Sequence, residues 1–444
     1  GRPRGPKILV PASVSRLESF ARCPFAFFLN YGLKLKPRLE YEFSPPAAGH
    51  LYHEALRRFV EEVEAAGIPW DQLPENRIEQ ICGAVVDELA ERLQGSILLT
   101  SGRLRRQKEH LRERISHSAR AMARHFGQSK FLPVATEVPF GTAAAEPGGP
   151  AAENRQDAGT EPGAKHPAGL PACWGRLALP PREVLLEKAG GKEVSLVLGG
   201  RIDRLDAAQE GNCLFVRVVD YKTAPLDLRL ADVLAGLQIQ LLFYLAAAEA
   251  GLQALLRSKG CALEVLAGGA FYFPVQRPLL PKNIADPAEL DREWLKTFKL
   301  KGWLFDHSPA SPAYFRMLDA SLEPGRSSLL VPLSLNREGA VNRTFSSRVF
   351  SPAEWAALRR ELEAVAARMG RDMAAGRVDI APVQAGRSLA CASCDFRQVC
   401  RFDPLLPENR PRPVRTGSRE LRQLLAAQAT GEEETVLDPA KLDR

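Results

Sequence analysis

Two aspartates and a lysine occupy positions from which they could act together on a phosphate group. Asp220 and Lys222 end the apolar run 213–222 and lie two residues apart, so in a strand both side chains point to one face. Asp203 lies near the end of the preceding apolar run, and residues 207–212 predict a turn that returns the chain beside Asp220. Converging carboxylates suit Mg²⁺ or Mn²⁺, and a neighbouring lysine can stabilise charge on a phosphate oxygen. A solvated ion pair at a strand end is the competing interpretation of an isolated Asp-X-Lys.

Four of the eight cysteines are spaced to hold one metal centre. Cys391, Cys394 and Cys400 lie within ten residues of one another. Cys23 is the candidate for the fourth ligand, because the C-terminal part offers neither a further cysteine nor a nearby histidine. Four thiolates suit Zn²⁺ as well as an iron–sulfur cluster, so the ligand chemistry leaves both open. Binding by all four would join the two ends of the chain.

Length and composition are typical of a soluble globular protein of two or three domains. The chain has 444 residues, of which 45% are hydrophobic and 25% charged. It shows no apolar run long enough to span a bilayer and no secretory signal, so we expect a cytoplasmic protein without membrane contact. The net charge of +7 is compatible with a polyanionic partner but does not require one. Because the sequence does not begin with methionine, we expect a fragment of a longer protein or a processed form.

Hydrophobic periodicity predicts a mainly helical region at 12–130. Two short helices are expected within 13–36, followed by helices at about 49–66, 75–94 and 103–127. The last of these is rich in arginine and could contact a nucleic-acid backbone, as could Arg387, Arg397 and Arg401 around the cysteine cluster. A solvated helix face explains the basic helix equally well.

Changes in composition along the chain predict three further regions. The region 131–280 is expected to hold the core strands and one helix at 230–251, interrupted at 141–181 by a disordered insertion rich in Ala, Pro and Gly. The region 281–404 contains a helix at 351–376, with Ser351 as N-cap, and then the cysteine loop. Residues 405–444 form a basic tail rich in Pro and Arg with a short terminal helix.

The order of these features resembles the RecB-like branch of the PD-(D/E)XK nuclease superfamily. That order is an apolar strand ending in Gly-X-Ile-Asp, a hairpin, an apolar strand ending in Asp-Tyr-Lys, and a helix with Gln-X-X-X-Tyr. The resemblance implies an α/β, restriction-endonuclease-like core with a mixed central sheet flanked by helices. It also implies that Asp203 and Asp220 are metal ligands for Mg²⁺ or Mn²⁺ and that Lys222 is the catalytic lysine.

The resemblance assigns roles to further residues of the candidate active site. RecB-like nucleases carry a histidine on an early helix, which makes His53 the implied third metal ligand in preference to His50. Gln240 and Tyr244 are implied to support the active site or to contact DNA. Without the resemblance, His53 would be a partly buried helix histidine and Tyr244 an interior tyrosine with a bonded hydroxyl. Glu137 is a further candidate for an auxiliary acidic residue on a core strand.

The cysteine spacing narrows the resemblance to an iron–sulfur subset of these nucleases. One cysteine before the core and a C-X2-C-X5-C cluster after it imply a 4Fe–4S cluster with a structural role, held by Cys23, Cys391, Cys394 and Cys400. Zinc is the competing occupant. The resemblance covers about residues 12–404 and is poor at 141–181 and 280–350. Its opening segment is similar to the nuclease domains of bacterial helicase–nuclease subunits, which implies a helicase–nuclease A subunit as partner.

The predicted function is therefore metal-dependent DNA exonuclease activity in double-strand-break repair and recombination. The expected substrate is linear DNA ends with single-stranded tails. No G-X-X-X-X-G-K-[ST] loop occurs in the chain, so we expect no ATP binding by this chain. A non-catalytic iron–sulfur module for DNA binding or scaffolding is one alternative, disfavoured because both aspartates and the lysine occur together. A stand-alone iron–sulfur exonuclease of the CRISPR-adaptation type is another.

Overall fold

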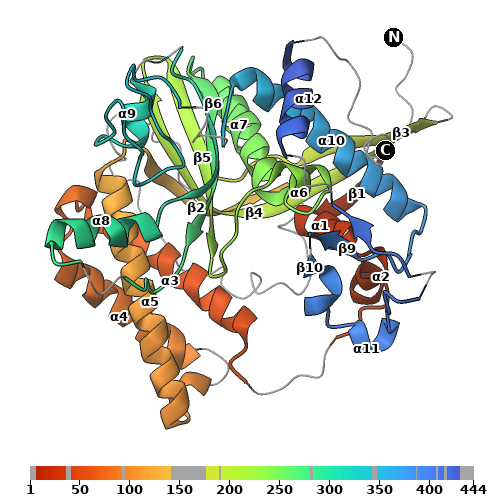
Figure 1. Ribbon diagram of the computed structural model, residues 1–444, viewed down its shortest axis with the longest axis horizontal. Coiled ribbons are helices and arrows are strands. Elements are labelled where there is room, and N and C mark those ends of the chain that lie inside the picture. The colour runs from red at the N-terminus through yellow and green to blue at the C-terminus, as the bar shows by residue number, and fades with distance from the viewer. Residues whose placement is uncertain are drawn as a thin grey trace.

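The computed structural model places a central sheet between two groups of helices (Figure 1). It describes residues 7–36, 42–92, 96–141, 177–189, 192–280, 284–309, 311, 313–342, 348–386, 388–406, 409–414 and 418–430. Most of the predicted insertion at 141–181, and also Arg387, lie outside these residues. The predicted α/β class with a mixed sheet flanked by helices is confirmed.

Within the described residues, the main sheet has eight strands, and β4 (Lys192–Glu210) connects its two halves. The first half of β4 pairs with β1 in parallel and with β3 in antiparallel orientation, and its second half pairs antiparallel with β2 and β5. The order then continues from β5 through β6, β7 and β8. The other strands are β1 (Lys7–Ser13), β2 (Leu132–Phe140), β3 (Arg182–Ala189), β5 (Cys213–Lys222), β6 (Glu264–Pro274), β7 (Lys301–Phe305) and β8 (Val349–Phe350).

The predicted turn at 207–212 is wrong in length. The strand β4 runs to Glu210, and the chain reverses over two residues, with Gly211 in the left-handed region at φ +57°. Ala207 and Ala208 are buried and pair with residues of β5, so burial on a central strand overrides the turn-like composition of this segment. The hairpin is tight, which fixes the register between β4 and β5.

One face of the sheet carries the helices α3 (Pro45–Ala66), α4 (Glu75–Arg92) and α5 (Gly102–Gly127) (Figure 1). The helix α3 begins at Pro45, four residues before the predicted start. Ser44 caps it by accepting from the Ala47 backbone N–H, and proline is tolerated in a first helical turn. The aromatic side chains of this layer, including Phe59 and Phe126, pack against residues of β5 and β6.

The opposite face is covered by α6 (Leu230–Leu234), α7 (Gln240–Ser258) and α10 (Pro352–Ala374). The predicted single helix at 230–251 is therefore wrong, because Gly236 breaks it with φ +80°. A Cβ at Gly236 would lie 2.8 Å from Met369 Sδ, so tertiary packing requires glycine there. The capping box of Ser351 and Glu354 confirms the predicted start of α10.

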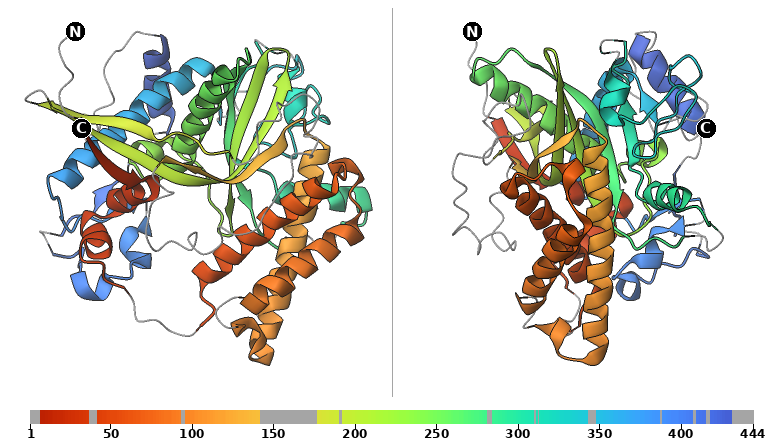
Figure 2. Two further views of the ribbon diagram at one scale, coloured as in Figure 1. Left: turned by 180° about the vertical axis from the view of Figure 1, so that it is seen from behind. Right: turned by 90° about the vertical axis from the view of Figure 1, so that its left-hand side faces the viewer.

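Near the start of the described chain, two short helices lie beside part of its C-terminal region (Figures 1 and 2). The helices α1 (Val14–Arg22) and α2 (Pro24–Phe27) adjoin the segment that carries the C-terminal cysteines, and the Phe25 backbone N–H donates to Asp379 O at 3.1 Å. The remaining α-helices are α8 (Pro287–Thr297), α9 (Tyr314–Leu318), α11 (Arg397–Cys400) and α12 (Ser418–Thr430). There are also a π-helix at Phe28–Gly32 and short helical turns at Trp70–Gln72, Ile97–Leu99 and Ala390–Ser393. A second, small sheet consists of β9 (Val383–Ala385), β10 (Ser388–Leu389) and β11 (Arg412–Pro413). Among the helices of the described residues, none is both long and apolar enough to cross a bilayer.

Candidate active site

The β4–β5 hairpin brings Asp203, Asp220 and Lys222 to one end of the two strands. Arg204 pairs with Val219, so Asp203 and Asp220 are the next residues along the ladder and share a face. Asp203 Oδ2 accepts from the Tyr221 backbone N–H at 3.0 Å, and Lys222 Nζ lies 2.5 Å from Asp220 Oδ2. The proximity that the sequence predicted for these side chains is present.

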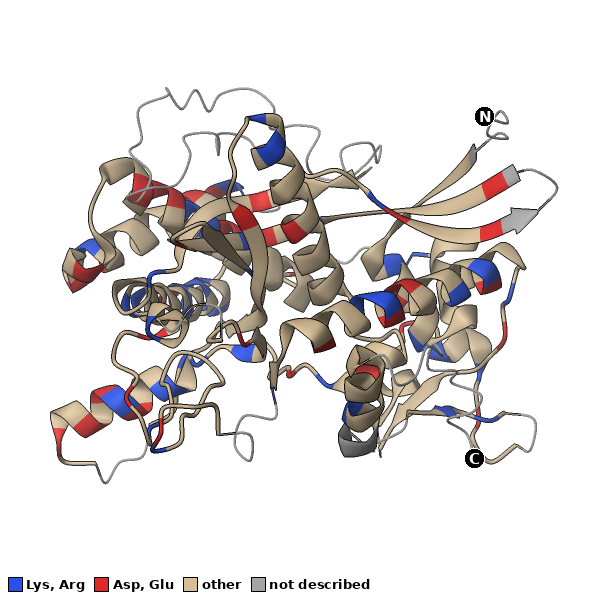
Figure 3. Ribbon diagram, turned by 90° about the horizontal axis from the view of Figure 1, so that it is seen from above, with Lys and Arg blue, Asp and Glu red and all other residues tan. Residues whose placement is uncertain are grey.

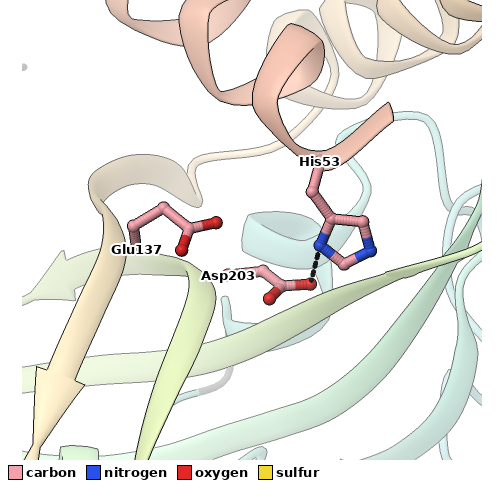
Figure 4. Close-up of side chains that lie close together, drawn as sticks. All are labelled: His53, Glu137 and Asp203. Atoms are coloured by element: carbon pink, nitrogen blue, oxygen red, sulfur yellow. Dashed lines mark ion pairs between the residues drawn. The ribbon is translucent and has the colours of Figure 1, made fainter. Parts of the chain in front are cut away.

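His53 reaches this strand end from α3. Neighbouring residues of α3 are buried against the sheet, which turns the half-buried imidazole toward the strands. Its Nδ1 lies 3.1 Å from Asp203 Oδ2 (Figure 4). Burial lowers the pKa of the His53 ring, but the hydrogen bond to Asp203 and its negative charge outweigh burial and raise that pKa above its usual value.

Glu137 on β2 completes a group of possible metal ligands. Within the described part of the chain, His53, Glu137 and Asp203 form the group of three or more His, Cys, Asp or Glu side chains whose ligand atoms all lie within 4.8 Å of one another (Figure 4). Glu137 has φ +50°, an unusual value for a residue with a side chain, and Arg201 Nη1 donates to its Oε2 at 3.4 Å. Asp220 is outside this group.

Burial and mutual repulsion oppose the ionisation of the carboxylates at this site. Burial, and then the charge of Asp203, raise the pKa of Asp220 to about 7. Burial and the same neighbour raise the pKa of Glu137. Burial also acts against ionisation of Asp203, but the hydrogen bond and charge of His53, the Tyr221 backbone N–H and the charge of Lys222 together outweigh burial and lower the pKa of Asp203. Carboxylates with imidazole in a half-buried site are a donor set that fits Mg²⁺ or Mn²⁺.

Gln240 and Tyr244 form one hydrogen-bonded pair at the start of α7. Gln240 Nε2 donates to Tyr244 Oη at 2.6 Å, and the Tyr244 ring packs edge-on against Phe140. A Cβ at Gly200 would lie 2.7 Å from Tyr244 Cε1, so the glycine of Gly-Arg-Ile-Asp allows β4 to approach this ring. Tyr244 is buried, so this pair supports the strand that carries Asp203.

Sequence reasoning missed Glu18. This residue of α1 accepts from the Gln240 backbone N–H at 2.8 Å, and burial raises its pKa to about 7. Its charge also acts on Lys222. The only local signal is an acidic residue on a short amphipathic helix, which does not indicate a contact with a residue 222 positions away.

The four predicted cluster cysteines line one cavity of about 190 Å³. All four are free thiols, and Cys23 comes from the end of α1, whereas the other three come from the C-terminal segment. No three of these described thiols have sulfurs that all lie within 4.8 Å of one another.

A groove of about 930 Å³ opens beside the candidate metal ligands. Arginines on its wall are paired with glutamates, since Arg57 bonds Glu54 and Glu61, and Arg58 bonds Glu54 and Glu88. On the predicted basic helix, now α5, several cations are paired in the same way. Along the ribbon in Figure 3, Lys and Arg residues are interspersed with Asp and Glu residues. Three arginines near the start of α5 are exposed: Arg103, Arg105 and Arg106.

A mixed sheet between helices, with carboxylates, a histidine and a lysine at one strand end, is typical of a nuclease fold, and the sequence comparison agrees. The family model for the PD-(D/E)XK nuclease superfamily matches residues 11–401, so the chain belongs to that superfamily. The predicted resemblance to this family is thereby confirmed.

Curated relatives are similar over most of this chain. The B subunit of the ATP-dependent helicase/deoxyribonuclease of Desulforudis audaxviator is 39% identical over 406 residues, which are 91% of this chain and 30% of that protein. The corresponding B subunits of Desulforamulus reducens and Pelotomaculum thermopropionicum are each 34% identical, over 90% and 91% of this chain. The chain spans about 30% of the length of the curated relatives it matches.

Proposed function

We propose that this chain is a metal-dependent deoxyribonuclease that hydrolyses phosphodiester bonds, with exonuclease action on DNA ends. The observation that carries the proposal is the convergence of His53, Glu137 and Asp203 beside the Asp220–Lys222 pair. Membership of a nuclease superfamily supports it independently.

In this proposal His53, Asp203 and Glu137 hold a divalent ion, and Asp220 contributes a further carboxylate. When bound, such an ion lowers the pKa of water and offsets negative charge on a phosphate. Lys222 is held by Asp220 with its ammonium at the same strand end, and burial, which lowers its pKa, is outweighed by that carboxylate. Lys222 therefore remains charged and stabilises the negative charge that develops on the phosphate oxygens.

The four thiols of the cysteine cavity hold a 4Fe–4S cluster in this proposal. Four thiolates suit Zn²⁺ equally well, and the likeness of the cysteine spacing to the iron–sulfur subset of these nucleases favours the cluster. The cavity brings together one cysteine from the start of the chain and three from its C-terminal part. The cluster would join the two ends of the chain, and free thiols suit the reducing cytoplasm.

The partner and substrate follow from the names of the relatives. Those proteins are subunits of an ATP-dependent helicase/deoxyribonuclease. By that likeness, this chain is the nuclease part of a helicase–nuclease complex with an A subunit, and it acts on linear DNA ends with single-stranded tails in double-strand-break repair and recombination. Binding to phosphates would then weaken steeply with salt.

The test compares wild type with Asp220→Ala on linear DNA in Mg²⁺. We expect cleavage to be lost, by roughly a thousandfold or more, with DNA binding retained in a mobility-shift assay. Equal cleavage by both proteins would reject the assignment of the site. For the cysteine cavity, anaerobically purified protein should contain about four irons per chain, and stoichiometric zinc would reject the cluster.

A further inference from the structure

The short helix α1 contacts both the cysteine cavity and the candidate active site. Ser19, Arg22 and Cys23 line the cysteine cavity at the C-terminal end of α1. Glu18, one residue before Ser19, bonds the first residue of α7 instead. The same nine-residue helix therefore contributes side chains to both sites.

Glu18 acts as the cap of α7. The N-cap residue of α7 is Ile239, whose side chain cannot accept a hydrogen bond, so the first backbone N–H groups of this helix need another acceptor. Glu18 Oε1 accepts from the Gln240 N–H at 2.8 Å, and a carboxylate at a helix N-terminus is also favoured by the helix dipole. Gln240 in turn bonds Tyr244 Oη, so the position of Glu18 bears on that pair.

Glu18 also belongs to the electrostatic surroundings of Lys222. Its negative charge raises the pKa of Lys222 together with the charges of Asp220 and Asp203. Lys222 Nζ lies 5.9 Å from the centre of the Tyr272 ring, and the pKa of that tyrosine is raised mainly by burial and then by the charges of Asp220 and Glu18. Asp220, the direct partner at 2.5 Å, holds the Lys222 ammonium, and the charge of Glu18 is a smaller contribution.

The helix α1 is packed firmly enough to transmit a displacement. Val14, Leu17, Phe20 and Ala21 are all buried in the core, so the helix cannot shift at one end without shifting at the other. Its C-cap is Cys23 itself, whose backbone N–H donates to Ser19 O.

We propose that Glu18 is a positioning residue through which α1 couples the cysteine cavity to the candidate active site. The proposal rests on the proposed nuclease function and extends it to the regulation of the same site. A centre bound at Cys23 would fix the C-terminal end of α1, and Glu18 would carry that position to Gln240 through its 2.8 Å hydrogen bond.

The first test separates Glu18 from a general packing role. For Glu18→Ala we expect kcat on linear DNA to fall roughly tenfold to a hundredfold with KM nearly unchanged, because the lost hydrogen bond orients Gln240, and through it Tyr244, rather than binding DNA. Glu18→Gln keeps an acceptor for the Gln240 N–H, so it should recover most of the lost kcat. The control is Glu64→Ala, another half-buried helix glutamate, which accepts from Trp70 Nε1 at 2.7 Å away from the site. Wild-type kcat in Glu18→Ala, or an equal loss in both glutamine and alanine variants, would overturn the proposal.

The second test needs no cleavage and so is independent of the proposed function. Hydrogen–deuterium exchange at the first turn of α7 should accelerate at least severalfold in both Glu18→Ala and Cys23→Ser, since the first removes the acceptor and the second releases the end of the helix that holds it. Cys261→Ser is the matched control, because Cys261 is a free cysteine outside the cavity. Unchanged exchange at this turn in Cys23→Ser would refute the coupling even if Asp220→Ala abolishes cleavage. Conversely, cleavage by Asp220→Ala with faster exchange in Cys23→Ser would refute only the nuclease assignment.

Discussion

The two faces of the β4–β5 hairpin carry the same kinds of side chain with opposite outcomes. On the face toward α5, Asp206 is bonded by both Arg204 and Arg217, with Arg204 Nε at 2.7 Å and Arg217 Nε at 2.9 Å. Arg204 also donates to Tyr221 Oη at 3.2 Å. On the other face, Asp203 and Asp220 lie next to each other, and Lys222 pairs with Asp220.

The difference shows which charges the fold satisfies by itself. The buried carboxylate of Asp206 has two guanidinium partners, so it needs nothing from outside. The carboxylate of Asp220 has one partner and a repelling neighbour, and its raised pKa expresses that imbalance. One residue of offset along a strand therefore separates a structural ion network from a site with a deficit of positive charge, which is the condition for binding a cation.

The largest expected effect is on the structural face. Replacing Asp206 by Ala leaves two buried guanidinium groups without a carboxylate, so the free energy of unfolding should fall by about 3–5 kcal/mol in urea denaturation. Asp232→Ala is the control, because Asp232 is also buried but its partner Arg229 has 59% of its side chain exposed. If both variants lost the same stability, burial of the ion network would not be the cause.

On the other face of the hairpin we expect a smaller change, in which a substitution raises the free energy of unfolding. The folded-state pKa of Asp220, about 7, exceeds its ordinary value of 3.8, so its contribution to stability is lost as pH rises through that interval. Asp220→Asn removes this titration, and in EDTA at pH 8 it should be more stable than wild type by roughly 1–3 kcal/mol. The advantage should shrink toward pH 4. If the difference in unfolding free energy between Asp220→Asn and wild type were the same at pH 8 and pH 4, the charge imbalance at Asp220 would be contradicted.

The smallest effect concerns the support of β4. Tyr244→Phe keeps the ring against Phe140 but loses the bond from Gln240, so it should cost about 1 kcal/mol of unfolding free energy and reduce cleavage severalfold. Tyr314→Phe is matched, since Tyr314 Oη donates to Gly268 O at 3.0 Å in the core. Tyr314→Phe should lose a similar amount of unfolding free energy, but its cleavage of DNA should be unchanged. Equal losses of cleavage would show that the effect is not local to the site.

The hairpin and its two faces were predictable because alternation along an apolar strand fixes which residues share a face. That rule places Asp220 and Lys222 on one face, the hairpin brings Asp203 beside them although its turn was predicted too long, and their role as an active site came from the resemblance to a nuclease family. The break before Gln240 was not predictable, because Gly236 needs its left-handed backbone only when Met369 packs against it. Glu18 was missed since its contact with Gln240 arises only when α1 packs beside α7. The meeting of Cys23 with the C-terminal cysteines was predictable by counting possible ligands, and the identity of their occupant stays a prediction.

Metal binding tests the central claim most directly. Isothermal titration of wild type with Mn²⁺ should show saturable binding, and Asp203→Asn should lose both this binding and DNA cleavage while its circular dichroism spectrum stays unchanged. Asp203 is the right position, because its Oδ2 lies 3.1 Å from His53 Nδ1 and its carboxylate belongs to the ligand group with His53 and Glu137. Wild-type Mn²⁺ affinity and stoichiometry in folded Asp203→Asn would contradict the account.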